Sequence, residues 1–319
     1  MRLRIVVIGA GAMGSLFGGH LHASGHDVTL VTSNVAHVTA VNRDGLEIRS
    51  SGSRLRVTPK AVLKPLSGDP ADLLIMSVKA YKTAEAIRES RSLVGPETRL
   101  LTLQNGLDNA EMIAQTVGEA GRILAGATYE GAVLEAPGRV RHSGGGWTVL
   151  SPWGPKGARA MDGARAVAAL LTEAGLEAQA VPDAKSVIWC KVAVNAAINP
   201  VTALLGVENG AIAELPMLQP VMEAVIGETL SVARSEGVEL REGLLEEVLR
   251  VARATARNRS SMLRDLDLAR PTEIMSLNGA IARKGEKSGI PTPVNRTLTH
   301  LVRARERITR KLLEASLDN

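Results

Sequence analysis

The sequence predicts an α/β fold with an N-terminal Rossmann-type parallel sheet and a second, all-helical C-terminal domain. In the first half, short apolar segments alternate with helical segments, as in a parallel sheet whose two faces are covered by helices. After Pro182-Asp183 no strand-like segment is evident. Because a chain of 319 residues is too long to pack around a single hydrophobic core, we expect two domains, at residues 1–183 and 184–319.

The predicted elements follow this alternation in order. Apolar segments typical of buried strands lie at residues 4–8, 28–31, 73–78 and 100–103. Helical segments are expected at residues 12–24, from about residue 80, and at residues 107–117. From residue 121 to 150, Val and Thr alternate with Gly and Pro, which predicts antiparallel strands that close the sheet, with a turn at Gly144-Gly145-Gly146.

The remaining segments are predicted to be helical. An alanine-rich helix is expected over residues 156–174. In the C-terminal domain the helices are expected to break near Pro200, Pro216, Pro271 and Pro291. The basic residues of the last helix predict a solvated helix face.

Composition narrows the classes of partner. With 2% aromatic residues the chain has almost no material for stacking on single-stranded nucleic acid, and its net charge of +5 is spread without a dense basic run. No segment approaches the ~18 uninterrupted apolar residues of a membrane span. We therefore expect no nucleic-acid partner and no membrane, and a mild attraction for an anionic small molecule.

The cysteine count and the N-terminus bear on the compartment. Cys190 is the single cysteine, so no disulfide can form within the chain, in agreement with a reducing, cytoplasmic compartment. Its apolar helical surroundings predict a buried, inert thiol. Arg2 and Arg4 precede an apolar run that imitates a signal peptide, but the glycines of that run are better explained by a nucleotide-binding motif.

That motif is Gly9-Ala10-Gly11-Ala12-Met13-Gly14, which matches G-x-G-x-x-G. Gly9 allows a tight turn, Gly11 lets the backbone approach a pyrophosphate, and Gly14 lets the helix pack close to the strand. The helix N-terminus, around Ala12 and Met13, faces the phosphate charge. The motif follows a strand and opens a helix, a context that predicts dinucleotide binding.

The end of the second strand bears on which nicotinamide cofactor binds. NAD-dependent proteins tend to place Asp or Glu there, against the ribose 2′-hydroxyl. This chain has Thr32-Ser33-Asn34, whose hydroxyls and amide can donate to a 2′-phosphate, and no acid to repel it. The pattern favours NADP (NADPH), with Ser33 as a cofactor contact, although the three residues could simply form a turn and a helix cap.

A polar stripe marks an otherwise apolar helix in the C-terminal domain. Lys191, Asn195 and Asn199 recur at i, i+4 and i+8, so they share one helix face. Buried polar groups must find partners, and a structural hydrogen-bond network and a functional site are equally compatible with this stripe. A lysine in apolar surroundings is suited to donate a proton, because desolvation lowers its pKa toward neutrality.

The sequence resembles the ketopantoate reductase (2-dehydropantoate 2-reductase) family over nearly its whole length. The specific part is the Lys-x-x-x-Asn-x-x-x-Asn-Pro helix followed by the motifs of the second half. In chain order the matching segments are residues 9–14, Val78-Lys79-Ala80-Tyr81, Gln104-Asn105-Gly106, residues 191–200, Asn209-Gly210, Ser260-Ser261-Met262-Leu263-Arg264-Asp265, Thr272-Glu273-Ile274, Asn278-Gly279 and Gly289-Ile290-Pro291-Thr292-Pro293-Val294-Asn295. One departure is Ser33, where many members of the family carry an arginine that holds the 2′-phosphate.

The resemblance implies a role for individual residues. It implies that Lys191 is the general acid and that Glu273 binds the substrate hydroxyl and helps to keep Lys191 charged. The implied substrate-binding residues are Asn105, Asn195, Asn199, Asn209 and Ser261. It also implies that Asn105 lies near the nicotinamide ribose and that Lys79 lies near the cofactor and the substrate carboxylate.

Local structure offers other interpretations of the same motifs. Ser260-Ser261 could cap a helix. Glu273 could complete a capping arrangement at a helix start, and Asn278-Gly279 could mark a helix terminus. The histidines show no ligand spacing, so no metal site is predicted.

The expected activity is therefore NADPH-dependent reduction of 2-dehydropantoate to pantoate. A positioned ammonium can neutralise the developing alkoxide and then supply the proton, so hydride transfer needs no metal. One alternative is a reductase of a different 2-oxo acid on the same scaffold, and another is a dinucleotide-binding sensor without catalysis. The partner expected is a small-molecule 2-oxo acid substrate, and a homodimer is left open.

Overall fold

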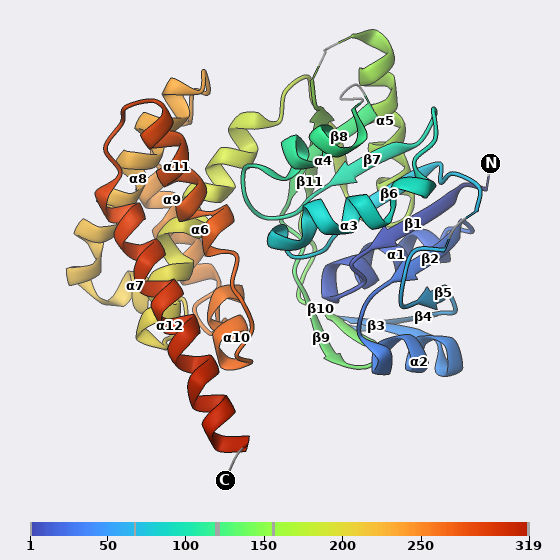
Figure 1. Ribbon diagram of the computed structural model, residues 1–319, viewed down its shortest axis with the longest axis horizontal. Coiled ribbons are helices and arrows are strands. Elements are labelled where there is room, and N and C mark those ends of the chain that lie inside the picture. Colours follow the sequence, from blue (N-terminus) through green and yellow to red (C-terminus); the bar gives the residue numbers. More distant parts are fainter. Residues whose placement is uncertain (1, 67, 119–121, 155–156, 318–319) are drawn as a thin grey trace. The chain divides into compact units, whose positions relative to one another are not determined.

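The computed structural model describes residues 2–66, 68–118, 122–154 and 157–317 (Figure 1). The chain forms two compact units, one comprising Met1–Gln104 and Asn109–Ala184 and the other Asn105–Asp108 and Lys185–Asn319. Each unit has its own hydrophobic core. The first contains a largely parallel sheet and the second is helical, so the predicted fold class is confirmed.

The first unit is organised on an eight-stranded sheet with the order β12-β11-β8-β7-β6-β1-β2-β5. Its strands are β1 (Arg4–Ile8), β2 (Asp27–Val31), β5 (Lys60–Val62), β6 (Leu73–Met76), β7 (Arg99–Thr102), β8 (Ile123–Thr128), β11 (Thr148–Pro152) and β12 (Ala178–Ala180). The run β5-β2-β1-β6-β7-β8 is parallel throughout and has the 3-2-1-4-5-6 order of dinucleotide-binding sheets.

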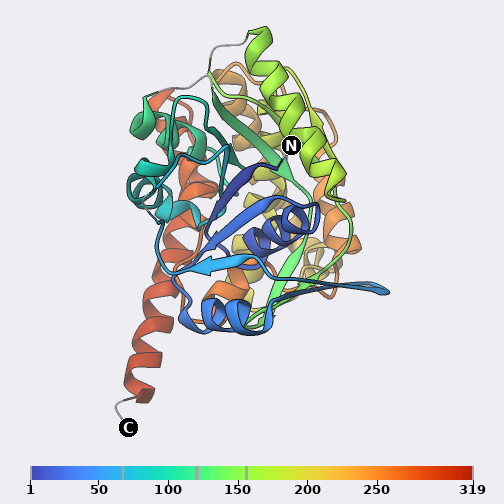
Figure 2. The same ribbon diagram turned by 90° about the vertical axis from the view of Figure 1, so that its right-hand side faces the viewer.

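Helices cover both faces of this sheet. They are α1 (Ala12–Ala23), α2 (Val35–Asp44), η1 (Ala80–Lys82), α3 (Thr83–Glu89), η2 (Arg91–Leu93), α4 (Asn109–Val117) and α5 (Ala158–Glu173). Ile5 and Val7 of β1 point into one core with Leu16 of α1 and Leu171 of α5, because strand side chains alternate between faces. Figure 2 shows α3 and α4 on the other side of the sheet from α1 and α5.

A second sheet, β4-β3-β10-β9, was not predicted. It consists of β3 (Leu46–Ser50), β4 (Ser53–Val57), β9 (Ala132–Ala136) and β10 (Arg139–His142). The expectation that residues 121–150 close the first sheet is therefore partly wrong. β11 pairs antiparallel with β8, but β10 pairs with β3, from which 88 residues of chain separate it. Figure 2 shows the β3–β4 hairpin extending to one side.

Packing against α1 explains the second sheet. A Cβ on Gly18 would lie 2.4 Å from Leu30 of β2, and one on Gly19 would lie 2.5 Å from Ile48 of β3. These glycines let α1 approach both sheets closely, which alternation within a single segment does not reveal. The glycines at residues 144–146 lie in an irregular segment between β10 and β11. The strand region was expected to begin at residue 121 and the alanine-rich helix at residue 156, and both positions lie outside the described residues.

In the described part of residues 185–319, every regular element is helical. These elements are α6 (Lys185–Leu205), α7 (Ala211–Glu214), η4 (Pro216–Leu218), α8 (Gln219–Ser235), α9 (Leu244–Ala254), α10 (Ser261–Asp267), η5 (Ile274–Ser276), α11 (Asn278–Lys287) and α12 (Pro293–Leu317). By length and composition α6 could cross a membrane, but 72% of its apolar window is buried within the protein, as in a core helix.

The predicted break at Pro200 is wrong, because α6 continues through it to Leu205. Proline has no N–H, so it cannot donate to the carbonyl four residues earlier, here that of Ala196. The Nδ2 of Asn278 donates to the Ala196 carbonyl at 2.9 Å instead. A distant side chain thus replaces the hydrogen bond that Pro200 cannot make, and the helix persists.

Asn278 belongs to a buried network that joins four helices. Its Nδ2 also donates to Oδ1 of Asn295 on α12, at 3.0 Å. The Nδ2 of Asn295 donates to Glu228 of α8 at 2.7 Å, and the same carboxylate accepts the backbone N–H groups of Val294 and Asn295. Asn278 and Asn295 are fully buried, so this network fixes α6, α8, α11 and α12 relative to one another.

Replacing Asn278 is therefore expected to destabilise the protein. Asn278→Ala leaves the Ala196 carbonyl and Asn295 Oδ1 without their donor, and a buried unsatisfied group costs about 2 kcal/mol. Urea denaturation followed by circular dichroism measures the loss. Glu286→Ala, on the exposed face of the same helix, serves as the control and should change stability by less than about 0.5 kcal/mol. Equal stability of the two variants would contradict this account of α6.

Candidate active site

The glycine-rich loop lies at the carboxyl end of β1. Gly9 has φ +98°, and the N–H groups of Gly9 and Ala10 donate to the Val31 carbonyl of β2 at 2.9 and 2.8 Å. A Cβ on Gly14 would lie 2.4 Å from the Gly9 carbonyl oxygen, so only glycine lets α1 begin so close to the loop. In contrast, a Cβ on Gly11 would meet nothing within 4 Å.

The open space beside Gly11 fits a dinucleotide. Gly11 is the N-cap of α1 with no side chain of its own, and Ala12 and Met13 form the first helical turn beyond it. Exposed N–H groups and the helix dipole favour a phosphate at such a position. The structure thus has the backbone cradle that a pyrophosphate requires, and the absence of a Cβ at Gly11 keeps it accessible.

The loops after β1 and β6 meet at the point where the strand order reverses. A Cβ on Gly9 would lie 2.4 Å from the Val78 N atom. Lys79 follows Val78, is half-buried and precedes η1. The Nε2 of Gln104 donates to the Val78 carbonyl at 2.7 Å and to Thr83 Oγ1 at 2.8 Å. Ligands of open α/β sheets bind at this switch point, so Lys79 stands where an anionic cofactor or substrate group is expected.

Gln104 also lies in this region, although it was not among the predicted site residues. Its side chain ties the segment after β6 to the first turn of α3. The sequence feature that could have identified Gln104 is its place in the Gln104-Asn105-Gly106 motif directly after β7. The structure adds which carbonyl its amide bonds.

The segment after β2 is partly occupied by a helix cap. Asn34 is the N-cap of α2, and its Oδ1 accepts from the His37 N–H at 3.0 Å. Thr32 Oγ1 accepts from the Asn34 N–H at 3.3 Å. Ser33 is exposed and has no acidic neighbour in the Thr32-Ser33-Asn34 segment. The turn-and-cap interpretation thus holds for Thr32 and Asn34, and the contact of Ser33 with the cofactor stays a prediction.

In the second unit, α6 carries the predicted polar stripe as one continuous helix. Lys191 and Asn195 are half-buried and Asn199 is buried, while the intervening Val192 and Ala196 lie in the core. Burial lowers the pKa of Lys191 from 10.5 to about 8, and the Glu273 carboxylate opposes this shift by favouring the charged form. Lys191 is thus poised near neutral pH.

Glu273 precedes η5 and is 7% exposed. Its carbonyl accepts the N–H groups of Ser276 and Leu277. Beside it, Thr272 Oγ1 accepts the Ile274 N–H at 3.2 Å, and the Thr272 N–H donates to Glu306 of α12 at 2.7 Å. The Glu273 carboxylate is held in place by this backbone, and does not act as a helix-capping side chain.

Asn105 joins Glu273 although 168 residues separate them in the chain. Its Nδ2 donates to Glu273 Oε2 at 3.4 Å. The short segment Asn105–Asp108 belongs to the second unit, where the Leu107 N–H donates to the Ser276 carbonyl and Asp108 pairs with Arg283. Lys191, Glu273 and Asn105 therefore form one electrostatically coupled group.

The other predicted substrate contacts are placed less closely. Ser260 is the N-cap of α10, and it leaves the neighbouring Ser261 exposed in the first turn. Asn209 lies beyond the end of α6, where its Nδ2 donates to Thr255 and its N–H to the Asn258 carbonyl. These contacts do not bring Asn209 to Lys191, so its part in substrate binding stays a prediction.

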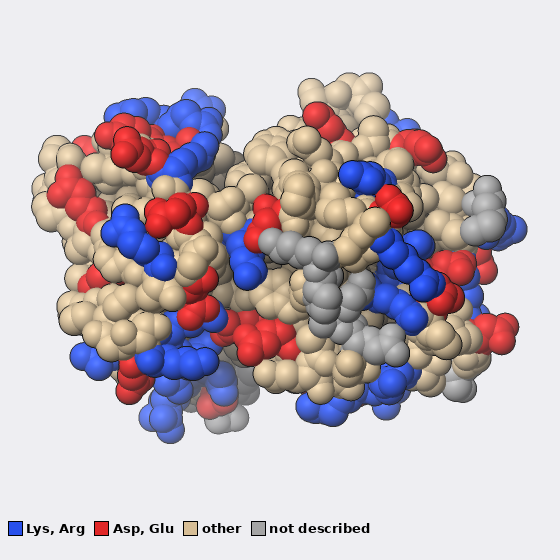
Figure 3. Space-filling view, turned by 90° about the horizontal axis from the view of Figure 1, so that it is seen from above, with Lys and Arg blue, Asp and Glu red and all other residues tan. Residues whose placement is uncertain are grey.

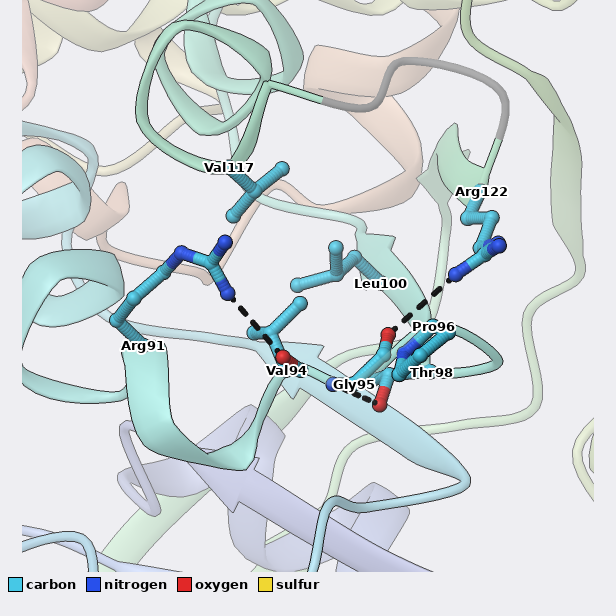
Figure 4. Close-up of a pocket in the computed structure, with 8 residues that line it drawn as sticks. All are labelled: Arg91, Val94, Gly95, Pro96, Thr98, Leu100, Val117 and Arg122. Carbon is cyan, nitrogen blue, oxygen red and sulfur yellow. Dashed lines mark hydrogen bonds between the residues drawn. The ribbon is translucent and has the colours of Figure 1, made fainter.

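A cavity of about 200 Å³ in the first unit is a different feature (Figure 4). It is lined by Arg91, Val94, Gly95, Pro96, Thr98, Leu100, Val117 and Arg122. These residues precede or begin β7 and β8, so the cavity lies at the amino ends of the parallel strands, at the sheet edge opposite the glycine loop. It is also smaller than the roughly 300 Å³ of typical ligand pockets. It is not the candidate site.

On the face drawn in Figure 3, Lys and Arg side chains are interspersed with Asp and Glu. Within the described residues, no group of three or more His, Cys, Asp or Glu side chains could hold a metal ion.

Cys190 is half-buried, with a thiol pKa raised by burial, so its environment does not activate it.

A dinucleotide-binding sheet and a desolvated lysine beside a carboxylate define a nicotinamide-dependent oxidoreductase. The chain matches the models for ketopantoate reductase PanE/ApbA over residues 5–155 and for its C-terminal domain over residues 183–306. It is 40% identical to a 2-dehydropantoate 2-reductase of Halobacterium salinarum, over 96% of this chain and 99% of that protein. The chain belongs to the ketopantoate reductase PanE/ApbA family.

Solved structures agree with this membership. A PanE/ApbA family ketopantoate reductase from Ralstonia eutropha is 31% identical, with a TM-score of 0.87, over 96% of this chain and 99% of that one. A D-mandelate dehydrogenase bound to NADH and anilino(oxo)acetate is also 31% identical, with a TM-score of 0.88 and the same coverage. The scaffold is therefore shared by proteins named for different substrates.

The geometry of the glycine loop predicts the effect of one added methyl group. Gly11→Ala places its Cβ in open space, and the negative φ of Gly11 suits alanine, so stability should be unchanged. The same Cβ obstructs the pyrophosphate, so affinity for NADPH should fall roughly tenfold or more, which corresponds to about 1.4 kcal/mol. Fluorescence titration with NADPH measures it. Gly227→Ala on α8, also facing open space, is the matched control, and equal affinities of the two variants would refute the assignment.

Proposed function

We infer that this chain reduces 2-dehydropantoate to pantoate with NADPH. The observation that carries the reaction type is the desolvated Lys191 coupled to Glu273. The full-length similarity to proteins named 2-dehydropantoate 2-reductase supports the substrate. The dinucleotide-binding sheet and its open glycine loop support the cofactor.

The first unit would hold the cofactor. When bound, NADPH supplies the hydride that reduces the ketone carbon. Gly9, Gly11 and Gly14 shape the loop that accepts its pyrophosphate at the start of α1, with Ala12 and Met13 in the first turn. Ser33 can donate to the 2′-phosphate, and the Lys79 ammonium supplies a positive charge for the cofactor or the substrate carboxylate.

Lys191 acts as the general acid in this proposal. As the carbonyl carbon is reduced, its oxygen becomes an alkoxide, and the Lys191 ammonium stabilises that charge and transfers one proton to it. The products are the alcohol and a neutral lysine, which takes up a proton from solvent. With a pKa of about 8, Lys191 is mostly protonated at neutral pH and is a stronger acid than an ordinary lysine, so it can donate its proton to the alkoxide.

The remaining polar groups position the substrate. Glu273 accepts a hydrogen bond from the substrate hydroxyl and keeps Lys191 charged, while Asn105 holds the Glu273 carboxylate. Asn195, Asn199 and Ser261 offer donors to an anionic 2-oxo acid. This set contains one acid among several donors, as a substrate with one carboxylate and one hydroxyl requires.

A second candidate is a dehydrogenase of another 2-hydroxy acid that uses NAD. The likeness to D-mandelate dehydrogenase in complex with NADH favours it, as does Ser33 where many family members have an arginine. The higher identity to the curated reductases favours 2-dehydropantoate. We further propose a cytoplasmic protein with a small-molecule substrate, and a homodimer stays open to measurement.

Substrate and proton donor can be tested together. NADPH oxidation at 340 nm is followed with 2-dehydropantoate, with other 2-oxo acids, and with NADH in place of NADPH; D-mandelate with NAD is the reverse-direction assay. Lys191→Ala should lower kcat by about 10²–10⁴-fold, as expected for a lost general acid. Lys287→Ala, an exposed lysine of the same unit, should keep full activity. Turnover of D-mandelate but not of 2-dehydropantoate would replace the substrate and keep the acid.

The pH dependence has a definite sign. Reduction needs protonated Lys191, so kcat/KM should fall as pH rises through about 8, and the oxidation of pantoate should rise over the same range. Glu273→Gln removes the charge that raises the pKa of Lys191, so the alkaline limb should move to lower pH. Profiles from pH 6 to 10 on both proteins test this, and a limb unmoved by Glu273→Gln would uncouple the two residues.

A further inference from the structure

His37 is a fully buried histidine that the proposed reaction does not use. It lies in the first turn of α2, yet its side chain contacts two other elements. Its Nδ1 is 2.9 Å from the Gly138 N atom, in the turn between β9 and β10. Its Nε2 is 3.1 Å from Ser15 Oγ on α1, and Ser15 Oγ is 3.4 Å from the Ala10 carbonyl oxygen.

The direction of each hydrogen bond follows from its chemistry. A backbone N–H can only donate, so Nδ1 of His37 must accept from Gly138 and the ring proton must be on Nε2. Nε2–H then donates to Ser15 Oγ, and the Ser15 hydroxyl is left to donate to the Ala10 carbonyl. Burial lowers the pKa of His37, which keeps this neutral form at pH 7.

Ala10 is the residue between Gly9 and Gly11, in a loop with little side-chain mass to hold it. Its N–H is fixed by the Val31 carbonyl and its own carbonyl by Ser15. The Ala10 carbonyl shares a rigid peptide plane with the Gly11 N–H, which donates to the Gly9 carbonyl at 2.7 Å. Ser15 thus holds the carbonyl end of the peptide at the open cradle, and Gly9 holds its N–H end. The backbone N–H of His37 also holds Asn34, directly after Ser33.

We propose that His37 is a positioning residue for dinucleotide binding, because through Ser15 it orients the Ala10–Gly11 peptide of the glycine loop. This inference rests on the proposed function, since it assumes that the loop binds NADPH. It extends the binding site to a residue without cofactor contact, and to the second sheet through Gly138.

The test measures NADPH affinity by fluorescence titration, without substrate. His37→Leu should raise the Kd for NADPH about tenfold, with kcat at saturating NADPH and the KM for 2-oxo acid close to wild type. Ser15→Ala should give a similar loss, and the double variant should lose no more than either single one, because both act through one chain of hydrogen bonds. His37→Gln should restore affinity, since its amide can accept from Gly138 and donate to Ser15.

The control is Asn42→Ala on the same helix. Asn42 bonds the N–H and carbonyl of Ala61 at 2.9 and 2.8 Å and does not lead to the glycine loop. Its variant should bind NADPH as wild type does. If His37→Leu does not fold, Ser15→Ala and His37→Gln carry the test.

Three results would overturn the positioning role and leave the proposed function standing. They are wild-type affinity in folded His37→Leu or in Ser15→Ala, additive losses of affinity in the double variant, and an equal loss of affinity in Asn42→Ala. If the wild-type protein binds neither NADPH nor NADH, the proposed function fails and this inference fails with it.

Discussion

The burial of α6 is the constraint on which the second unit depends. A helix with Pro200 in its interior loses a hydrogen bond at the Ala196 carbonyl, and in the core no water replaces it. Asn278 supplies that bond from another helix and is itself held through Asn295 and Glu228. Lys191, Asn195 and Asn199 all precede Pro200, and the network holds the turn from Ala196 to Pro200 on which Asn199 lies.

The same burial determines the chemistry of Lys191. Burial disfavours the charged form of Lys191 and lowers its pKa, while the Glu273 carboxylate favours the charged form and raises it. The pKa is therefore about 8 instead of 10.5. Neither effect would suffice alone: without burial the lysine would be a poor acid at neutral pH, and without the carboxylate it would lose its proton too easily. In the proposed mechanism, the packing of α6 would thus serve both the stability of the second unit and the acidity of Lys191.

In the first unit, the proposed cofactor site is formed by exposed backbone instead of by side chains. Gly11 leaves its cradle open, while Gly9 and Gly14 allow the close contacts that hold the loop against the segment after β6 and against α1. Because the loop has almost no side chains of its own, it is held by hydrogen bonds to the Val31 carbonyl and from the Ser15 hydroxyl, while Gln104 holds the neighbouring segment after β6. Binding at this end is therefore a property of packing around the loop as much as of the motif.

Local pattern was enough to predict the strand–helix alternation, the glycine motif and the Lys191-Asn195-Asn199 stripe, because each depends on a short period or a fixed spacing. It also placed Glu273 and Asn105 among the site residues through the family resemblance. Three features are visible only in the folded chain: β3 pairs with β10, α6 passes through Pro200, and Asn105 reaches Glu273. Those outcomes join residues far apart in the chain, and local pattern carries no information about which distant groups will satisfy one another's hydrogen bonds.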